Sequence, residues 1–136
     1  MADYKLHVYP VDSSAQVIRK NANESDSGAT AFTFVAADFI KIKNTGNMRL
    51  FIEIGATSTS VKVFTSLKVD GLYDVADLEI AASTNTLHVL NNLDPDTFNE
   101  DEDAGALRSH SGTGAEDGYV AIQLSQATGV SVWATL

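Results

Sequence analysis

The sequence predicts an all-β protein, and three observations support this prediction. Apolar and polar residues alternate in several short runs, as they do in strands with one buried face. The runs are rich in Thr, Val and Ile, and clusters of Gly, Asn, Asp and Ser separate them. No window offers three helical turns of apolar residues at helical spacing. We therefore expect about nine short strands with little or no helix, in a sandwich or a closed barrel.

The expected elements follow one another along the whole chain. Residues 21–30 are expected to form a loop, and at most one helical turn is expected, within residues 93–108. The runs expected to form strands are residues 4–9, 15–20, 31–35, 39–43, 49–54, 59–67, 76–82, 86–93, 118–125 and 129–136.

Residues 39–54 predict a β-hairpin with a defined register. Ile40 and Ile42 share one face of the first strand, and Leu50 and Ile52 share one face of the second. If the strands pair, apolar residues must face apolar residues, because a slip of one residue would turn every core side chain to water. This requirement sets Ile42 opposite Leu50 and Ile40 opposite Ile52, with Asn and Gly supplying the turn between them.

Length and composition limit the possible classes of protein. A chain of 136 residues is expected to form one domain, residues 1–136. It contains no cysteine, which excludes disulfides, thiolate metal sites and cysteine nucleophiles. Residues 1–12 carry charges and no apolar run, so they predict neither a signal peptide nor a membrane anchor. We therefore expect a soluble protein that is made in a cytoplasm.

The net charge of -9 is unevenly spread along the chain. Residues 1–50 have a net charge of +1, residues 51–93 of -3 and residues 94–136 of -7. Such an acidic chain is repelled by phosphate backbones and by anionic membrane surfaces. We therefore expect no direct nucleic-acid partner and no membrane partner.

Residues 94–118 form a long acidic segment. Clustered carboxylates suit a hard cation such as Ca²⁺, but Phe98 occupies the third ligand position of an EF-hand loop, so the spacing does not match. A solvated loop that its like charges keep extended is the favoured interpretation. The carboxylates that remain weak Ca²⁺ candidates are Asp94, Asp96, Asp101 and Asp103.

The side chains that could perform catalysis are scattered along the sequence. His7 and His88 lie within expected strands and His110 lies in a loop, at no recognised zinc spacing. Ser109 and Ser111 flank His110, but adjacent side chains on an extended backbone point apart. The sequence therefore predicts no catalytic site and no cofactor, and we expect the protein not to be an enzyme.

Three segments share a pattern of strands that meet at short turns. The first is "DFIKIKNTGNMRLFIEI", residues 38–54, with an Asn-Thr-Gly turn between two strands. The second is "VDGLYDVADLEIAAST", residues 69–84, and the third is "YVAIQLSQATGVSVWATL", residues 119–136, which turns at "ATGV". In this order the segments resemble the small head decoration proteins of tailed bacteriophages, over roughly residues 32–136.

The resemblance implies a fold and a function. It implies an antiparallel, jelly-roll-like β-sandwich that binds the outer surface of an assembled phage capsid and bridges neighbouring capsid subunits. Such proteins stabilise the capsid without catalysis, often as homotrimers. The implied partner is the major capsid protein, and the implied location is the virion after synthesis in the host cytoplasm.

Two expectations concern the surface that contacts the capsid. The near-neutral to basic first half is expected to contact the capsid while the acidic loop faces water, because of the charge gradient. Pro10 separates residues 4–9 from the rest, so residues 1–12 are expected to form an extended N-terminal arm that adds a strand to a neighbouring subunit. The candidate interface residues are Tyr4, Leu6, Val8, Tyr9, Lys41, Lys43 and Arg49.

Two other functions compete with capsid binding. A carbohydrate- or ligand-binding β-sandwich module would need exposed aromatic side chains on one face. Trp133 and Tyr119 could stack on a sugar, but their apolar alternating runs favour positions in the core. A cupin-like enzyme would need clustered histidines with a carboxylate, which the three scattered histidines do not provide.

Overall fold

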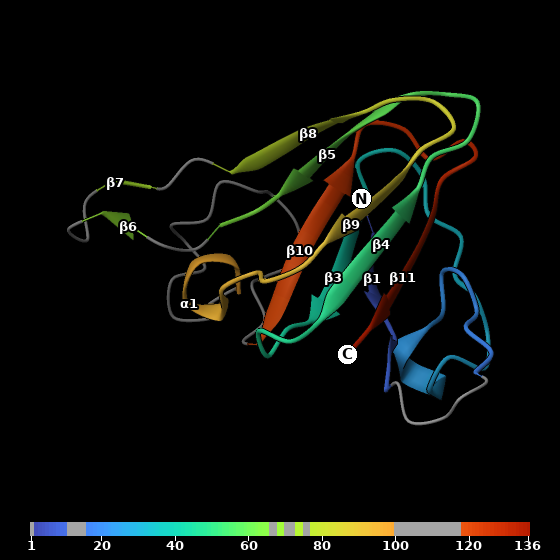
Figure 1. Cartoon of the computed structure of the whole chain (residues 1–136), viewed down its shortest axis with the longest axis horizontal. Helices are drawn as coiled ribbons and strands as arrows, with labels where there is room; N and C mark the ends of the chain where they lie inside the picture. The colour runs from blue at the N-terminus through green and yellow to red at the C-terminus, as the bar shows by residue number, and fades with distance from the viewer. Residues whose placement is uncertain (1, 11–15, 66–67, 70–72, 75–76, 100–117) are drawn as a thin grey trace.

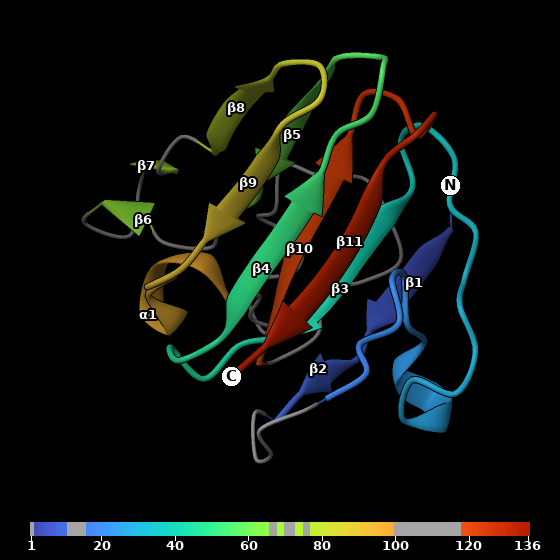
Figure 2. The ribbon, with the colours of Figure 1, turned by 45° about the vertical axis from the view of Figure 1, so that its right-hand side comes forward.

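The chain folds into two β-sheets that face each other, as Figures 1 and 2 show. The computed structural model describes residues 2–10, 16–65, 68–69, 73–74, 77–99 and 118–136. Within these residues, one sheet has five strands in the order β1-β3-β10-β5-β8, and the other has four in the order β2-β11-β4-β9. The predicted all-β sandwich is therefore confirmed.

The strands are short, as the sequence predicted. The five-stranded sheet consists of β1 (Asp3–Leu6), β3 (Phe39–Lys43), β10 (Tyr119–Leu124), β5 (Thr59–Val63) and β8 (Leu78–Ala82). The four-stranded sheet consists of β2 (Val8–Tyr9), β11 (Ser131–Thr135), β4 (Arg49–Glu53) and β9 (Leu87–Leu90). The remaining elements are the paired strands β6 (Lys68–Val69) and β7 (Tyr73–Asp74), the helical turn α1 (Pro95–Phe98) and the 3₁₀ turn η1 (Glu24–Asp26). The helical turn lies where the sequence predicted one.

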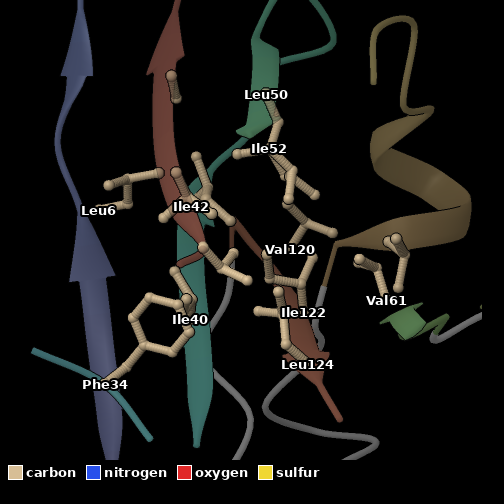
Figure 3. Close-up of a cluster of buried hydrophobic side chains, with 14 of the residues drawn as sticks. Leu6, Phe34, Ile40, Ile42, Leu50, Ile52, Val61, Val120, Ile122 and Leu124 are labelled. Atoms are coloured by element: carbon tan, nitrogen blue, oxygen red, sulfur yellow. The ribbon is translucent and has the colours of Figure 1, made fainter. Parts of the chain in front are cut away.

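The core fills the space between the two sheets. Ile40 and Ile42 of β3 and Leu50 and Ile52 of β4 have no exposed surface, and they belong to one apolar cluster with the inward side chains of the other strands. Figure 3 shows these side chains gathered between the strands. Burying an Ile or Leu side chain contributes about 1.5–3 kcal/mol. Alternation along each strand thus supplies the apolar faces that hold the sheets together.

The predicted hairpin over residues 39–54 is wrong. β3 pairs with β1 and β10, whereas β4 pairs with β11 and β9, so the two strands belong to different sheets. Residues 44–48 carry the chain from one sheet to the other. The apolar faces do meet as the sequence required, but across the core and not side by side in one ladder.

The crossing between the sheets is braced by Asn44, which is buried. Its side-chain amide donates to Leu93 O at 2.9 Å and to Asn99 Oδ1 at 2.8 Å, and the Asn99 amide donates to Asn44 O at 2.7 Å. These bonds tie the crossing to the segment that follows β9. They satisfy polar groups that would otherwise be buried without partners.

The connections alternate between the sheets in a jelly-roll-like manner. β3 leads to β4 in the other sheet, β4 leads back to β5, and β8, β9, β10 and β11 alternate in the same way. Neighbouring strands are antiparallel in most pairs, as predicted. The N-terminal strands differ, because β1 runs parallel to β3 and β2 runs parallel to β11.

Two of the expected strands do not form among the described residues. Residues 16–20 and 31–35 join no strand ladder, although Ala31 makes an isolated bridge with Ala22. Phe32 and Phe34 are nevertheless buried in the core, which explains the apolar alternation in that segment. In residues 31–35, alternation therefore reported burial correctly but not ladder pairing.

Candidate functional site

An apolar row crosses the outer face of the four-stranded sheet. Trp133 of β11 lies opposite Phe51 of β4, which in turn lies opposite Val89 of β9. The Trp133 and Phe51 rings stack with centroids 5.6 Å apart and planes 6° from parallel. Val89 is 46% exposed and Leu87, two residues earlier on the same face, is 51% exposed. We call Trp133, Phe51, Val89 and Leu87 the β9 surface.

A charged pair borders the β9 surface at its β11 end. Lys20 Nζ lies 5.5 Å from the centroid of the Trp133 ring and 2.7 Å from Glu53 Oε1. Both side chains of this ion pair are exposed, at 54% and 44%. An apolar centre with a charged rim is the usual composition of a protein–protein interface.

Trp133 and Tyr119 were predicted to lie in the core, and that interpretation is wrong for both. Val132 and Ala134 are the inward, fully buried residues of β11, so Trp133 between them points outward and is half-buried. Tyr119 is also half-buried, and its hydroxyl donates to Glu24 Oε1 at 2.7 Å. A short strand with apolar residues on both faces leaves the inward face ambiguous to sequence analysis.

The hydrogen-bond phase of β9 leaves part of its backbone facing outward. Ile54 N donates to Thr86 O at 2.8 Å, which makes Ile54 and Thr86 a hydrogen-bonded pair. Such pairs alternate along an antiparallel ladder, so His88 and Leu90 also turn their backbone groups toward β4. The N–H and C=O groups of Leu87 and Val89 therefore point away from the sheet. Among the described residues, β9 pairs with β4 alone.

The edge strand on the same side of the five-stranded sheet, β8, carries a charged residue, whereas β9 carries none. Phe64 N donates to Ala121 O and Ser125 N donates to Ser60 O, so Ser60 and Lys62 of β5 turn their backbone groups toward β10. The residues between them bond to β8 instead, and by the same alternation Glu79 and Ala81 of β8 turn their backbone groups outward. The Glu79 side chain is 69% exposed, and its Oε1 lies 3.5 Å from Lys62 Nζ. A charged side chain discourages another strand from pairing with an edge.

The predicted N-terminal arm is part of the chain's own sheets. β1 pairs with β3 and β2 pairs with β11, and Leu6 is fully buried in the core. Tyr4 stacks on Phe32 with centroids 4.9 Å apart, and Val8 packs against the core. The prediction of a separate arm is therefore wrong for these residues, because their apolar side chains bury themselves within the same molecule.

Of the three basic interface candidates, the structure buries one and exposes two. Lys41 is 3% exposed, and its Nζ lies 3.2 Å from Asp3 Oδ2. Burial among partners within the chain removes Lys41 from any contact surface. Lys43 and Arg49 are exposed and remain candidates.

The carboxylates considered for Ca²⁺ do not form a described site. Asp94 caps α1, with Oδ1 accepting from Asp96 N at 3.1 Å, and Asp96 is exposed. Asp101 and Asp103 lie outside the described residues, as does most of the predicted loop 94–118. Among the residues that the structure describes, no group of three or more potential ligands could hold a metal ion.

Neither of the two described histidines, His7 and His88, pairs with a nucleophile that it could activate. His88 Nε2 lies 3.0 Å from Thr86 Oγ1, but that hydroxyl donates to Ser83 O at 2.6 Å. In the tautomer that carries its proton on Nε2, His88 donates to the Thr86 hydroxyl while that hydroxyl donates to Ser83 O. His7 packs edge-on against Tyr9 with centroids 4.5 Å apart, and His110 lies outside the described residues.

The segments that carry the family resemblance are described only in part. Asp70–Leu72 lie outside the described residues. The final turn is present: Val130 N donates to Ala127 O at 3.1 Å, and Gly129 adopts a φ of 72°, which favours glycine. Asp77 Oδ1 accepts from Thr65 N at 3.0 Å, which joins the two ends of the β6–β7 segment.

Comparison with known proteins returned no relatives. No protein-family model, no curated protein and no solved structure matches the chain. In the described part of the molecule, no helix has the length and apolar character needed to cross a membrane.

The sequence interpretation missed the β9 surface. It did not consider Phe51 for binding, although Phe51 alternates with the inward Leu50 and Ile52 and so shares its face with Arg49 and Glu53. That position was itself a signal, because a Phe on a face with charged neighbours is exposed unless a further layer covers it.

Proposed function

We propose that this protein is a non-catalytic structural protein that binds the outer surface of an assembled phage capsid and bridges neighbouring capsid subunits. The observation that supports this most directly is the β9 surface, an exposed apolar row on the outside of a well-packed sandwich. Trp and other aromatic residues are enriched where protein interfaces concentrate their binding energy. The resemblance of residues 38–54 and 119–136 to head decoration proteins supplies the partner, the major capsid protein.

The β9 surface replaces the first half of the chain as the proposed contact. Two of the seven interface candidates, Leu6 and Lys41, are buried within the chain, so they cannot reach a partner. The net charge of -9 favours a partner surface with positive charge and disfavours phosphate or an anionic membrane. Trimer formation on the capsid remains part of the proposal.

Mass spectrometry of purified virions tests this function. We expect the protein in particles, in a fixed ratio to the major capsid protein, and we expect it to be lost when the outer surface is stripped with mild denaturant. Its absence from particles of a phage that encodes it would contradict the proposed function.

A carbohydrate-binding module is the second candidate, and the outward position of Trp133 favours it. A sugar stacks on a free aromatic face, but the indole already contacts the Phe51 ring and Lys20. Glycan-array binding that disappears in Trp133→Ala would support this candidate over capsid binding.

A further inference from the structure

We propose that β9 is a docking strand, which receives an extended segment of the partner protein as a new strand at the edge of the four-stranded sheet. The segment is apolar at alternate positions and carries net positive charge. This inference rests on the proposed function, because it names the site through which the protein attaches to its partner.

The backbone phase supplies the first step. Leu87 and Val89 direct their N–H and C=O groups away from β4, as the Ile54–Thr86 bond requires. An incoming strand can therefore form ladder hydrogen bonds at both residues without breaking any bond to β4. Pairing of this kind supplies affinity through main-chain hydrogen bonds, while side chains supply specificity.

The side chains supply the second step. Leu87 and Val89 are 51% and 46% exposed, so nothing in the chain covers them fully. An added strand would place alternate side chains directly beside these two residues, on the same outer face. Apolar side chains there would continue the row that runs from Trp133 through Phe51 to Val89, which is why the segment is apolar at alternate positions.

Charge supplies the third step and identifies the occupant. The chain carries -9, and the exposed carboxylates of Asp94 and Asp96 follow shortly after the C-terminal end of β9. A second copy would bring another -9 to the same edge, whereas a cationic segment would be attracted. The occupant is therefore a basic segment of another protein and not a second copy.

The other edges of the sandwich explain why β9 is the docking strand. The β8 edge carries the exposed Glu79. The β1 edge is occupied by the chain itself at its C-terminal end, where Leu6 bridges Asn23 and His7 N donates to Ala22 O at 2.9 Å. Of the strand edges that the structure describes, β9 combines outward backbone groups with exposed apolar side chains and no charge.

Two-dimensional NMR of the 14.5 kDa protein tests the inference with a designed peptide. The probe is the acetylated and amidated hexapeptide Lys-Val-Thr-Val-Lys-Val, and its counterpart replaces both Lys with Glu. We expect the basic probe to shift the amide signals of Leu87 and Val89, and the acidic counterpart to bind at least about fivefold more weakly. A probe N-methylated at the amides that face β9 is expected not to bind.

Two protein variants complete the experiment. Val89→Lys places a charge on the docking edge and is expected to weaken probe binding by at least about tenfold. Val17→Lys adds the same charge at a 90% exposed valine away from β9 and is expected to bind like the wild type. Both replaced side chains are exposed, so both variants are expected to fold.

Three results would overturn the inference: shifts absent from β9, equal binding of the two probes, or equal binding by Val89→Lys and the wild type. A concentration-dependent dimer that Val89→Lys abolishes would also overturn it, in favour of a second copy. These results are independent of whether the protein is found in virions, so failure of the docking strand and failure of the proposed function can be told apart.

Discussion

The two sides of the sandwich treat their strand edges differently. On the N-terminal side, a further segment of the chain bonds beside the outer strands: Asn21 exchanges hydrogen bonds with Val132 of β11, and Ala22 O accepts from His7 N, next to β1, at 2.9 Å. On the opposite side, β8 and β9 end the two sheets, and no further described segment bonds to their outer edges. The N-terminal side shows that a segment of this chain can bond beside the outer strands of the sandwich. The uncovered edges of β8 and β9 are therefore a feature that needs an explanation.

The two strands of the open side also differ from each other. β8 carries Glu79, which is paired with Lys62 and exposed, whereas β9 contains Leu87, His88, Val89 and Leu90 and no charged residue. Open edges without charges attract other strands. The contrast singles out β9 as the edge that is available to a partner.

The largest expected effect is on stability, and it distinguishes β1 on the N-terminal side from β9 on the opposite side. Leu6→Ala on β1 removes a fully buried side chain and is expected to lower the free energy of unfolding by about 3 kcal/mol. The matched variant Leu87→Ala removes a half-exposed side chain from β9 and is expected to cost less than about 1 kcal/mol. Urea unfolding of both variants measures the difference, and equal losses would contradict the assignment of β1 to the core.

The second prediction compares two ion pairs. Asp3→Asn removes the carboxylate that lies 3.2 Å from the buried Lys41 Nζ and is expected to cost about 2 kcal/mol, because the buried ammonium loses a partner of opposite charge. Glu53→Gln breaks the exposed pair with Lys20 beside the β9 surface and is expected to cost less than about 0.5 kcal/mol. Urea unfolding at neutral pH checks both values; a smaller loss for Asp3→Asn than for Glu53→Gln would refute the comparison.

The third prediction exchanges the properties of the two open edges. Glu79→Val removes the charge from β8 and is expected to increase aggregation, because it creates a second unprotected edge. Val89→Lys protects β9 and is expected to reduce aggregation. Light scattering during incubation at high protein concentration gives the comparison, with Val17→Lys as the control for added charge.

The smallest expected effect is a change in the pKa of Asp26, which lies in the 3₁₀ turn η1 on the N-terminal side. A hydrogen bond from the Thr30 hydroxyl, with further backbone bonds, lowers the pKa of Asp26 below its usual value of 3.8. A lowered folded-state pKa stabilises the protein above the unfolded value, and this contribution is lost as the pH falls through the folded pKa. Thr30→Ala is therefore expected to raise the pKa of Asp26 toward 3.8, measured by NMR titration of the carboxyl group. No change in the Asp26 titration would show that Thr30 is not responsible.

Sequence alone was sufficient for most of the strands and insufficient for the strands that they pair with. Alternation placed Ile40, Ile42, Leu50 and Ile52 on buried faces, and all four are buried. It could not show that β3 and β4 lie in different sheets, because an apolar face is buried equally well beside another strand of the same sheet or against the opposite sheet.

The same limit explains the errors at the candidate site. Lys41 alternates with isoleucines and so was expected on the outer face as an interface candidate, but Asp3, 38 positions away, is its partner within the chain and Lys41 is buried. The outward phase of Leu87 and Val89 depends on a bond between Ile54 and Thr86, which a single-sequence pattern does not contain. Long-range pairing therefore decides both which residues are exposed and which edge is free.

Binding to assembled capsids tests the central claim most directly. Wild-type protein, Val17→Lys and Val89→Lys are each sedimented with shells of the major capsid protein, and the bound fraction is measured against concentration. We predict that wild type and Val17→Lys bind alike and that Val89→Lys binds at least about tenfold more weakly. Equal binding by Val89→Lys, or no binding by the wild type, would contradict the account.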